Sequence, residues 1–174
     1  MKFSYPYLLF LCLLGFSQSL AAQDFPKIKK AMILAVESEE VTDSLYDKLV
    51  DLNSNDPLIW AYIATLDGLK AKHAWNPYMK LKYVSRSQKL IGKAVAAAPD
   101  DLEIRFMRFS LQHYTPSFLG FSKNLEEDKQ VILHLFELKK FGHSDAELVR
   151  NIAKFMLESN RCTPGEAQLL KKFV

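Results

Sequence analysis

The chain has 174 residues, with 23 lysines and arginines against 20 aspartates and glutamates, and a formal net charge of +3 at pH 7. This charge is too small to indicate a nucleic-acid-binding protein, because such proteins usually carry a strongly basic domain. The length fits one domain, which would bury about two-thirds of the surface that the unfolded chain exposes. Composition therefore predicts a single hydrophobic core and no nucleic-acid partner.

Residues 1–22 have the three parts of a secretory signal peptide. Lys2 provides a positive charge, residues 5–16 form an apolar stretch, and the segment ends on small residues at Ala22. A transmembrane helix needs about 20 consecutive apolar residues, and polar residues interrupt this stretch too early. The sequence thus predicts that residues 1–22 are cleaved and that residues 23–174 form a periplasmic or secreted protein without a transmembrane segment.

The two cysteines predict a domain without disulfides. Cys12 lies in the segment that cleavage would remove, which leaves Cys162 as a lone thiol. Stability must then come from packing. A secreted domain of this size without a disulfide framework is more typical of a bacterial periplasm than of an animal extracellular space.

Apolar residues recur at helical spacing along nearly all of the remaining chain, and no stretch shows sustained strand alternation. The pattern predicts helices at about 27–37, 41–53, 57–73, 78–98, 101–113, 125–140, 145–159 and 164–172. Capping residues precede four of them, namely Asp56, Asp100, Ser144 and Thr163. Because most connections are short, neighbouring helices should be antiparallel. We therefore expect an all-α fold built from antiparallel helical hairpins.

Residues 56–99 carry two spaced patterns of large and small residues, Trp60-x2-Ile63-Ala64 and Ser87-x3-Ile91-x2-Ala94. These patterns resemble a degenerate tetratricopeptide repeat, in which small residues lie where two paired helices approach closely. The chain also resembles small secreted helical proteins of Gram-negative bacteria that carry such repeats and have no assigned activity. The resemblance implies a short right-handed array of stacked hairpins whose groove binds another protein. Asp67 departs from the repeat, which has an aromatic residue at that position.

The helix predicted at 78–98 carries a basic stripe, which consists of Lys82, Arg86, Lys89 and Lys93. At helical spacing these four residues share the face opposite the apolar residues. The stripe is either a solvated helix back or a docking face for an acidic protein, a phosphate-bearing ligand or an anionic lipid surface. The second interpretation gains support because no acid interrupts the stripe, whereas solvated helix faces usually mix the two signs.

Asp67 is expected on the same face as Trp60, at the seam between paired helices, where a carboxylate needs a partner. Arg105 and Arg108 in helix 101–113 are the candidates, since an arginine can bind a carboxylate through two hydrogen bonds. These groups would form either a structural ion pair or the anion-binding end of a groove between helices 57–73 and 101–113.

Two short segments are unusually aromatic. The turn at 72–79 contains Trp75 and Tyr78, and the loop at 114–121 contains Phe118 and Phe121. The loop either covers the core as a lid or leaves aromatic side chains exposed for a partner, because exposed apolar patches on soluble proteins often mark interaction sites.

Catalytic and metal-binding patterns are weak. The four histidines stand at no recognised ligand spacing, and the sequence has no nucleophile or phosphate-loop motif. We therefore expect no metal, no cofactor and no catalysis. The sequence predicts an exported binding or adaptor module that contacts another protein or peptide in the cell envelope.

Two other functions remain open. A helical carrier of a lipid or other apolar ligand should contain a deep apolar cavity, whereas an adaptor should have an open concave face. An enzyme whose site is scattered along the sequence should bring histidine and carboxylate groups together in one pocket.

Overall fold

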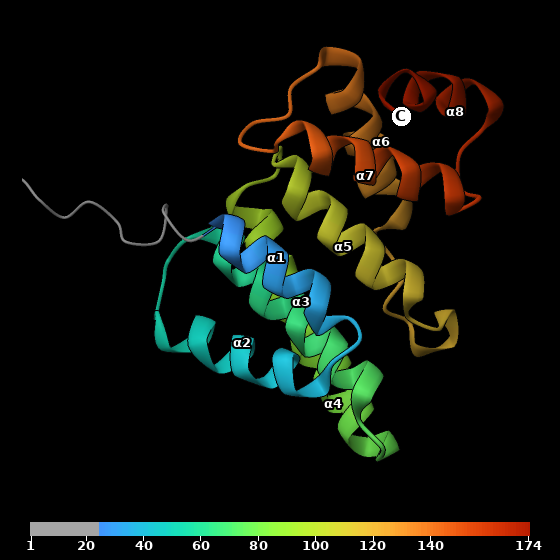
Figure 1. Cartoon of the computed structure of the whole chain (residues 1–174). Helices are drawn as coiled ribbons and strands as arrows, with labels where there is room; N and C mark the ends of the chain where they lie inside the picture. The colour runs from blue at the N-terminus through green and yellow to red at the C-terminus, as the bar shows by residue number, and fades with distance from the viewer. Residues whose placement is uncertain (1–24) are drawn as a thin grey trace, which may run out of the picture.

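The structure is a computed structural model that describes residues 25–174, in which every regular element is a helix (Figure 1). The all-α prediction is confirmed for these residues. The predicted signal peptide, residues 1–22, lies outside them. The helices are α1 (Phe25–Ala35), α2 (Glu39–Asp51), α3 (Pro57–His73), α4 (Pro77–Ala97), α5 (Leu102–Tyr114), α6 (Leu125–Leu138), α7 (Ala146–Glu158) and α8 (Pro164–Leu170), with short 3-10 turns η2 (Ser117–Leu119) and η3 (Lys171–Phe173).

Local capping signals explain where most of these helices begin. Asp56 caps α3 and Thr163 closes a capping box on α8, as the sequence predicts. Two predicted caps are wrong by one residue, because Asp101 caps α5 and Asp145 caps α7. In both cases the aspartate one position later is the one whose carboxylate reaches the backbone N–H groups of the first turn.

The helices pack in chain order around α3 and α5 (Figure 1). Helices α3 and α4 form a long hairpin, and α1 and α2 pack against α3. Helix α5 packs on α3, α4 and α6, and α8 then contacts α6 and α7. The right-handed repeat arrangement that the family resemblance implies stays a prediction.

Buried apolar residues form two clusters instead of the single core that composition predicts. The first cluster is built by α1 to α4 with Ile104 and Met107 of α5, and the second by α5 to α8 with Leu102 and Phe109 of α5. Helix α5 therefore contributes two of its faces, one to each cluster. It is the element that joins the two parts of the described chain.

The seam between α3 and α4 has the small residues that the repeat-like pattern predicts. Ala64, Ser87 and Ala94 are all buried there. Trp60 is half-buried instead of enclosed, and its Nε1 donates to the Ser54 carbonyl at 2.8 Å near the start of α3. Within residues 25–174, every helix is too short or too polar to cross a lipid bilayer.

Candidate functional site

The basic stripe is exposed along α4, but two of its four members already have partners. Arg86 donates to the Tyr46 hydroxyl and lies 3.3 Å from the Asp67 carboxylate. The Lys93 ammonium lies 3.6 Å from the centre of the Trp60 ring, at cation–π distance. Lys82 and Lys89 are exposed and make no ion pair with the residues that the structure describes. Two of the four side chains are therefore held by contacts within the protein, whereas Lys82 and Lys89 are the members of the stripe that can reorient toward a partner.

The aromatic side chains of the two predicted segments lie mostly in solvent. Trp75 is 98% exposed and Tyr78 is 72% exposed at the turn between α3 and α4. In the loop between α5 and α6, Phe118 is 86% exposed, whereas Phe121 is half-buried. Phe118 therefore does not cover the core as part of a lid.

Arg105 and Arg108 do not pair with Asp67, which corrects the sequence-based expectation. Both are buried between α5 and α6, where they face Asp128 and Glu127. Arg108 Nε donates to Asp128 Oδ2 at 2.7 Å, and Arg105 Nη1 donates to Asp128 Oδ1 at 2.9 Å and to Glu127 Oε1 at 2.6 Å. Burial opposes the charged form of Arg108, but the bonds to Asp128 raise its pKa above the ordinary value. These arginines hold α5 to α6 and are closed to a ligand.

Asp67 is buried at the seam as expected, but its cationic neighbour is Arg86. Burial raises the pKa of Asp67 to about 7, although Lys70 acts in the opposite direction. Its Oδ1 atom accepts no hydrogen bond from the described residues. The folded protein therefore favours the neutral form of this carboxyl group.

Asp67→Asn should remove a pH dependence of stability. Between about pH 4 and pH 7 the folded state binds more protons at Asp67 than the unfolded state, so the free energy of unfolding falls as pH rises. The variant cannot titrate, and we expect it to be more stable than the wild type at pH 8 by roughly 1–3 kcal/mol. Urea unfolding at pH 4 and pH 8 measures this, with the exposed Asp47→Asn as control. The prediction would be contradicted if the free energy of unfolding depended on pH equally in the wild type, Asp67→Asn and Asp47→Asn.

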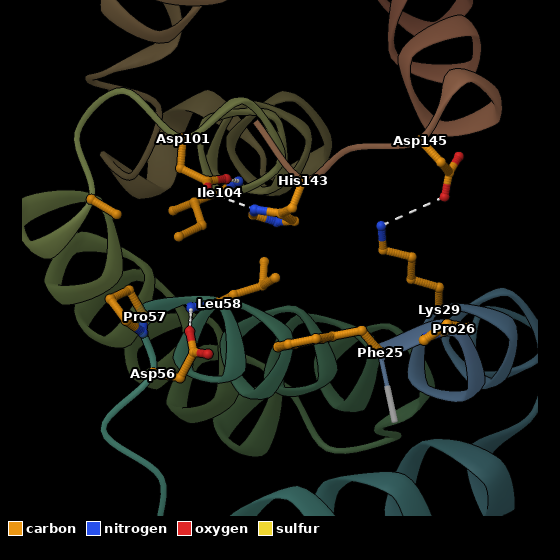
Figure 2. A pocket seen from close by; sticks show the side chains of 11 residues that line it. Phe25, Pro26, Lys29, Asp56, Pro57, Leu58, Asp101, Ile104, His143 and Asp145 are labelled. Atoms are coloured by element: carbon orange, nitrogen blue, oxygen red, sulfur yellow. Dashed lines mark hydrogen bonds and ion pairs between the residues drawn. The ribbon is translucent and has the colours of Figure 1, made fainter. Parts of the chain in front are cut away.

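A recess in the described structure lies where several helices begin (Figure 2). It is a half-open cleft of about 610 Å³ between the first turns of α1, α3 and α5, and the connection from α6 to α7 covers its other side. Its walls include Phe25, Leu58 and Ile104. The volume is within the range of small-molecule and peptide-side-chain pockets. The cleft lies between the two helices that the sequence predicts to form a groove, although none of the predicted site residues lines it.

Three aspartates at the rim of the cleft are helix caps. Asp56 Oδ1 accepts from the Leu58 N–H at 2.8 Å, and Asp101 and Asp145 make the equivalent bonds for α5 and α7 at 2.9 and 2.8 Å. Each carboxylate is thereby held in place by one of its two oxygens. The second oxygen of Asp101 and of Asp145 faces another cleft residue, as the dashed lines in Figure 2 show.

Below this rim lies a buried carboxylate, Glu103, which is 3% exposed. The Tyr62 hydroxyl donates to its Oε1 atom. Burial and the nearby Glu103 charge raise the pKa of Tyr62 far above its ordinary value, so this hydroxyl stays protonated as a donor. The Oε2 atom lies 3.2 Å from Lys29 Nζ and 3.5 Å from His143 Nε2, but it accepts no hydrogen bond from the described residues.

Lys29 and His143 connect the two parts of the chain across this cleft. Lys29 Nζ also lies 3.8 Å from Asp145 Oδ2, and His143 Nδ1 lies 3.6 Å from Asp101 Oδ2. Gly142 precedes the histidine with a φ of +57°, a left-handed conformation in which glycine avoids the steric cost of a side chain. This turn places His143 over the start of α5.

Sequence reasoning missed this cleft for a structural reason. The caps of α3, α5 and α7 are recognisable as caps, but they lie far apart in the chain and their convergence depends on tertiary packing. Lys29, Glu103 and His143 stand in no recognisable motif. The described residues contain no group of three or more histidine, cysteine or acidic side chains placed to hold a metal ion.

Comparison with known proteins adds no family to this description. No family model, curated protein or solved structure matches the chain.

Proposed function

We propose that this protein is an exported, non-catalytic binding module that holds a segment of another protein in the cleft between α3 and α5. The observation that carries the proposal is the cleft itself, which combines apolar walls with a rim of ordered carboxylates. A partner segment can bury apolar side chains against Leu58 and Ile104 while its polar groups reach the rim. The proposed export depends on residues 1–22 and stays a prediction.

The composition of the cleft favours this function over that of a lipid carrier. Asp56, Asp101 and Asp145 stand at its rim, and an acyl chain entering the cleft would desolvate these charges without compensating them. A protein segment can supply cations and N–H donors instead. The half-open shape also suits a segment that enters and leaves the cleft along the surface.

An acid–base enzyme is the second candidate, because one cleft contains His143 and two carboxylates within 3.6 Å of its ring nitrogens. An enzyme whose catalytic residues are scattered along the sequence would need this combination of groups in one pocket. However, Asp101 caps α5, and Glu103 is buried beneath Lys29. Each carboxylate thus has a structural role that explains its position without a reaction. Turnover of ester, peptide or glycoside substrates that disappears in His143→Gln would favour the enzyme.

Site-specific photocrosslinking in cells that export the protein tests the binding function. A photoreactive residue in place of Pro26, which lies on the rim of the cleft, should capture a discrete partner protein. The same residue at Lys89 in the basic stripe, at Phe118 in the exposed loop and at Asp47 on α2 serves for comparison. Adducts at Lys89 or Phe118 without one at Pro26 would contradict the cleft as the site. The absence of adducts at all four positions would contradict a binding module.

A further inference from the structure

We infer that the cleft recognises a positively charged side chain flanked by apolar residues, and that Lys29 occupies the cation position until a partner replaces it. This inference rests on the proposed function and names the chemistry of the partner segment. Three observations support it. They are the charge balance of the cleft, the Glu103 oxygen that accepts no hydrogen bond from the described residues, and the position of the Lys29 ammonium.

The charge balance of the cleft is opposite to that of the chain. Three aspartates, Asp56, Asp101 and Asp145, line the cleft, and Lys29 is the one lysine or arginine among the described residues that line it. The buried Glu103 lies beneath the lining, with its Oε2 atom 3.2 Å from Lys29 Nζ. The chain as a whole carries a net charge of +3. Within this basic protein the cleft is therefore an anionic position, and charge complementarity selects a cationic group from a partner.

The carboxylates are prepared to bind a cation before any partner arrives. Asp101 and Asp145 are each fixed through Oδ1 by a backbone N–H, which leaves Oδ2 for an interaction inside the cleft. Glu103 is fixed through Oε1 by the Tyr62 hydroxyl, which leaves Oε2 buried and without a hydrogen bond from the described residues. A ligand ammonium that donates to Oε2 would supply the missing bond without first ordering the site.

Lys29 shows that the cleft accepts an ammonium group. Its Nζ atom lies between Glu103 and Asp145, at 3.2 and 3.8 Å, but it forms no hydrogen bond with either carboxylate. Figure 2 shows its side chain reaching from α1 across the opening of the cleft toward Asp145. A cation on a partner segment, placed with better hydrogen-bond geometry, can therefore replace Lys29 with little electrostatic cost.

The apolar walls specify what lies beside this cation. Phe25 and Leu58 stand on one side of the cleft and Ile104 on the other, and Pro26 and Pro57 extend the apolar surface at the edge. A lysine or arginine with apolar neighbours would match both the charge and these walls. An acidic or uncharged polar segment would match neither.

Binding of three capped hexapeptides to the protein purified after export tests the inference. The peptides share apolar flanking residues and carry lysine, norleucine or glutamate at one central position. Calorimetric titration at low ionic strength should give an affinity about ten-fold higher for lysine than for norleucine, with glutamate weakest. Added salt should reduce the difference, because exposed charges are screened.

Matched variants separate the roles of the cleft residues. Asp101→Asn and Asp145→Asn should each weaken lysine-peptide binding several-fold while keeping α5 and α7 capped, since asparagine caps a helix as well as aspartate does. Asp47→Asn on α2 should have no effect. Lys29→Met removes the internal competitor and should strengthen lysine-peptide binding, whereas Lys30→Met, its neighbour outside the cleft, should not.

The contradicting outcomes distinguish this inference from the proposed function. Equal affinity for lysine and norleucine peptides, or the same affinity in all aspartate variants, would overturn cation recognition. Preference for the glutamate peptide would overturn it in favour of a basic surface. Absence of binding by all three peptides would also overturn it, while a photocrosslink from Pro26 would leave the binding module intact.

Discussion

Asp128→Ala should destabilise the protein by about 3–5 kcal/mol, because it leaves two buried arginines without their main acceptor. The Asp128 side chain is fully buried and accepts hydrogen bonds from both Arg105 and Arg108 at 2.7 to 2.9 Å. The other carboxylate that contacts these arginines among the described residues is Glu127, which is already bound to both of them. Urea unfolding followed by circular dichroism at pH 7 measures the loss.

Glu127→Ala is the control for this prediction. Glu127 contacts the same two arginines, but its side chain is 51% exposed. Water screens such a pair and can solvate the arginines after the change, so we expect a loss of about 1 kcal/mol or less. Equal losses for the two variants would contradict the assignment of Asp128 as the buried acceptor that joins α5 to α6.

Phe109→Ala should also cost about 3–5 kcal/mol, because it removes a fully buried ring from α5. The Phe109 ring packs edge-to-face against Phe155, with centroids 6.2 Å apart, and stacks near His113. Thermal or urea unfolding measures this change in the free energy of unfolding. The matched control is Phe118→Ala, where the ring is 86% exposed and the expected change is within about 0.5 kcal/mol. Comparable losses of stability in Phe109→Ala and Phe118→Ala would contradict the buried position of the Phe109 ring.

The same experiment tests whether α5 couples the two apolar clusters. Trp60 lies against the first cluster, whereas Phe109 belongs to the second. If α5 joins them, the fluorescence transition of the tryptophans and the circular dichroism transition should coincide in Phe109→Ala. A tryptophan transition that stays at its wild-type midpoint while the dichroism transition shifts would show that the two clusters unfold separately.

Local sequence signals predicted the helices well because their causes are local. The apolar period and the caps at Asp56 and Thr163 act within one helix, and helix ends differ from the predicted ones by two residues or fewer. The burial of Asp67 also follows from its position on the apolar face of α3. These features need no knowledge of how the helices are arranged.

The pairing of charged residues and the position of the cleft could not be predicted, because both depend on tertiary packing. Arg105 and Arg108 follow Asp67 in the next helix but one, yet the rotation of α5 about its axis turns them toward Asp128 on α6. The acidic start of α6 is explained by the helix dipole alone when the sequence is read locally. In the same way, nothing local indicates that Asp101 and Asp145 converge with Asp56.

Nuclear magnetic resonance tests the central claim most directly. The lysine hexapeptide is titrated into ¹⁵N-labelled protein, and the amide shifts are followed. We predict the largest changes at the N–H groups of Leu58, Ile104 and Leu148, because these groups donate to the three capping aspartates of the cleft. The largest changes along the basic stripe at Lys82 and Lys89, or no changes at the three capped amides, would contradict the cleft as the site that binds a partner.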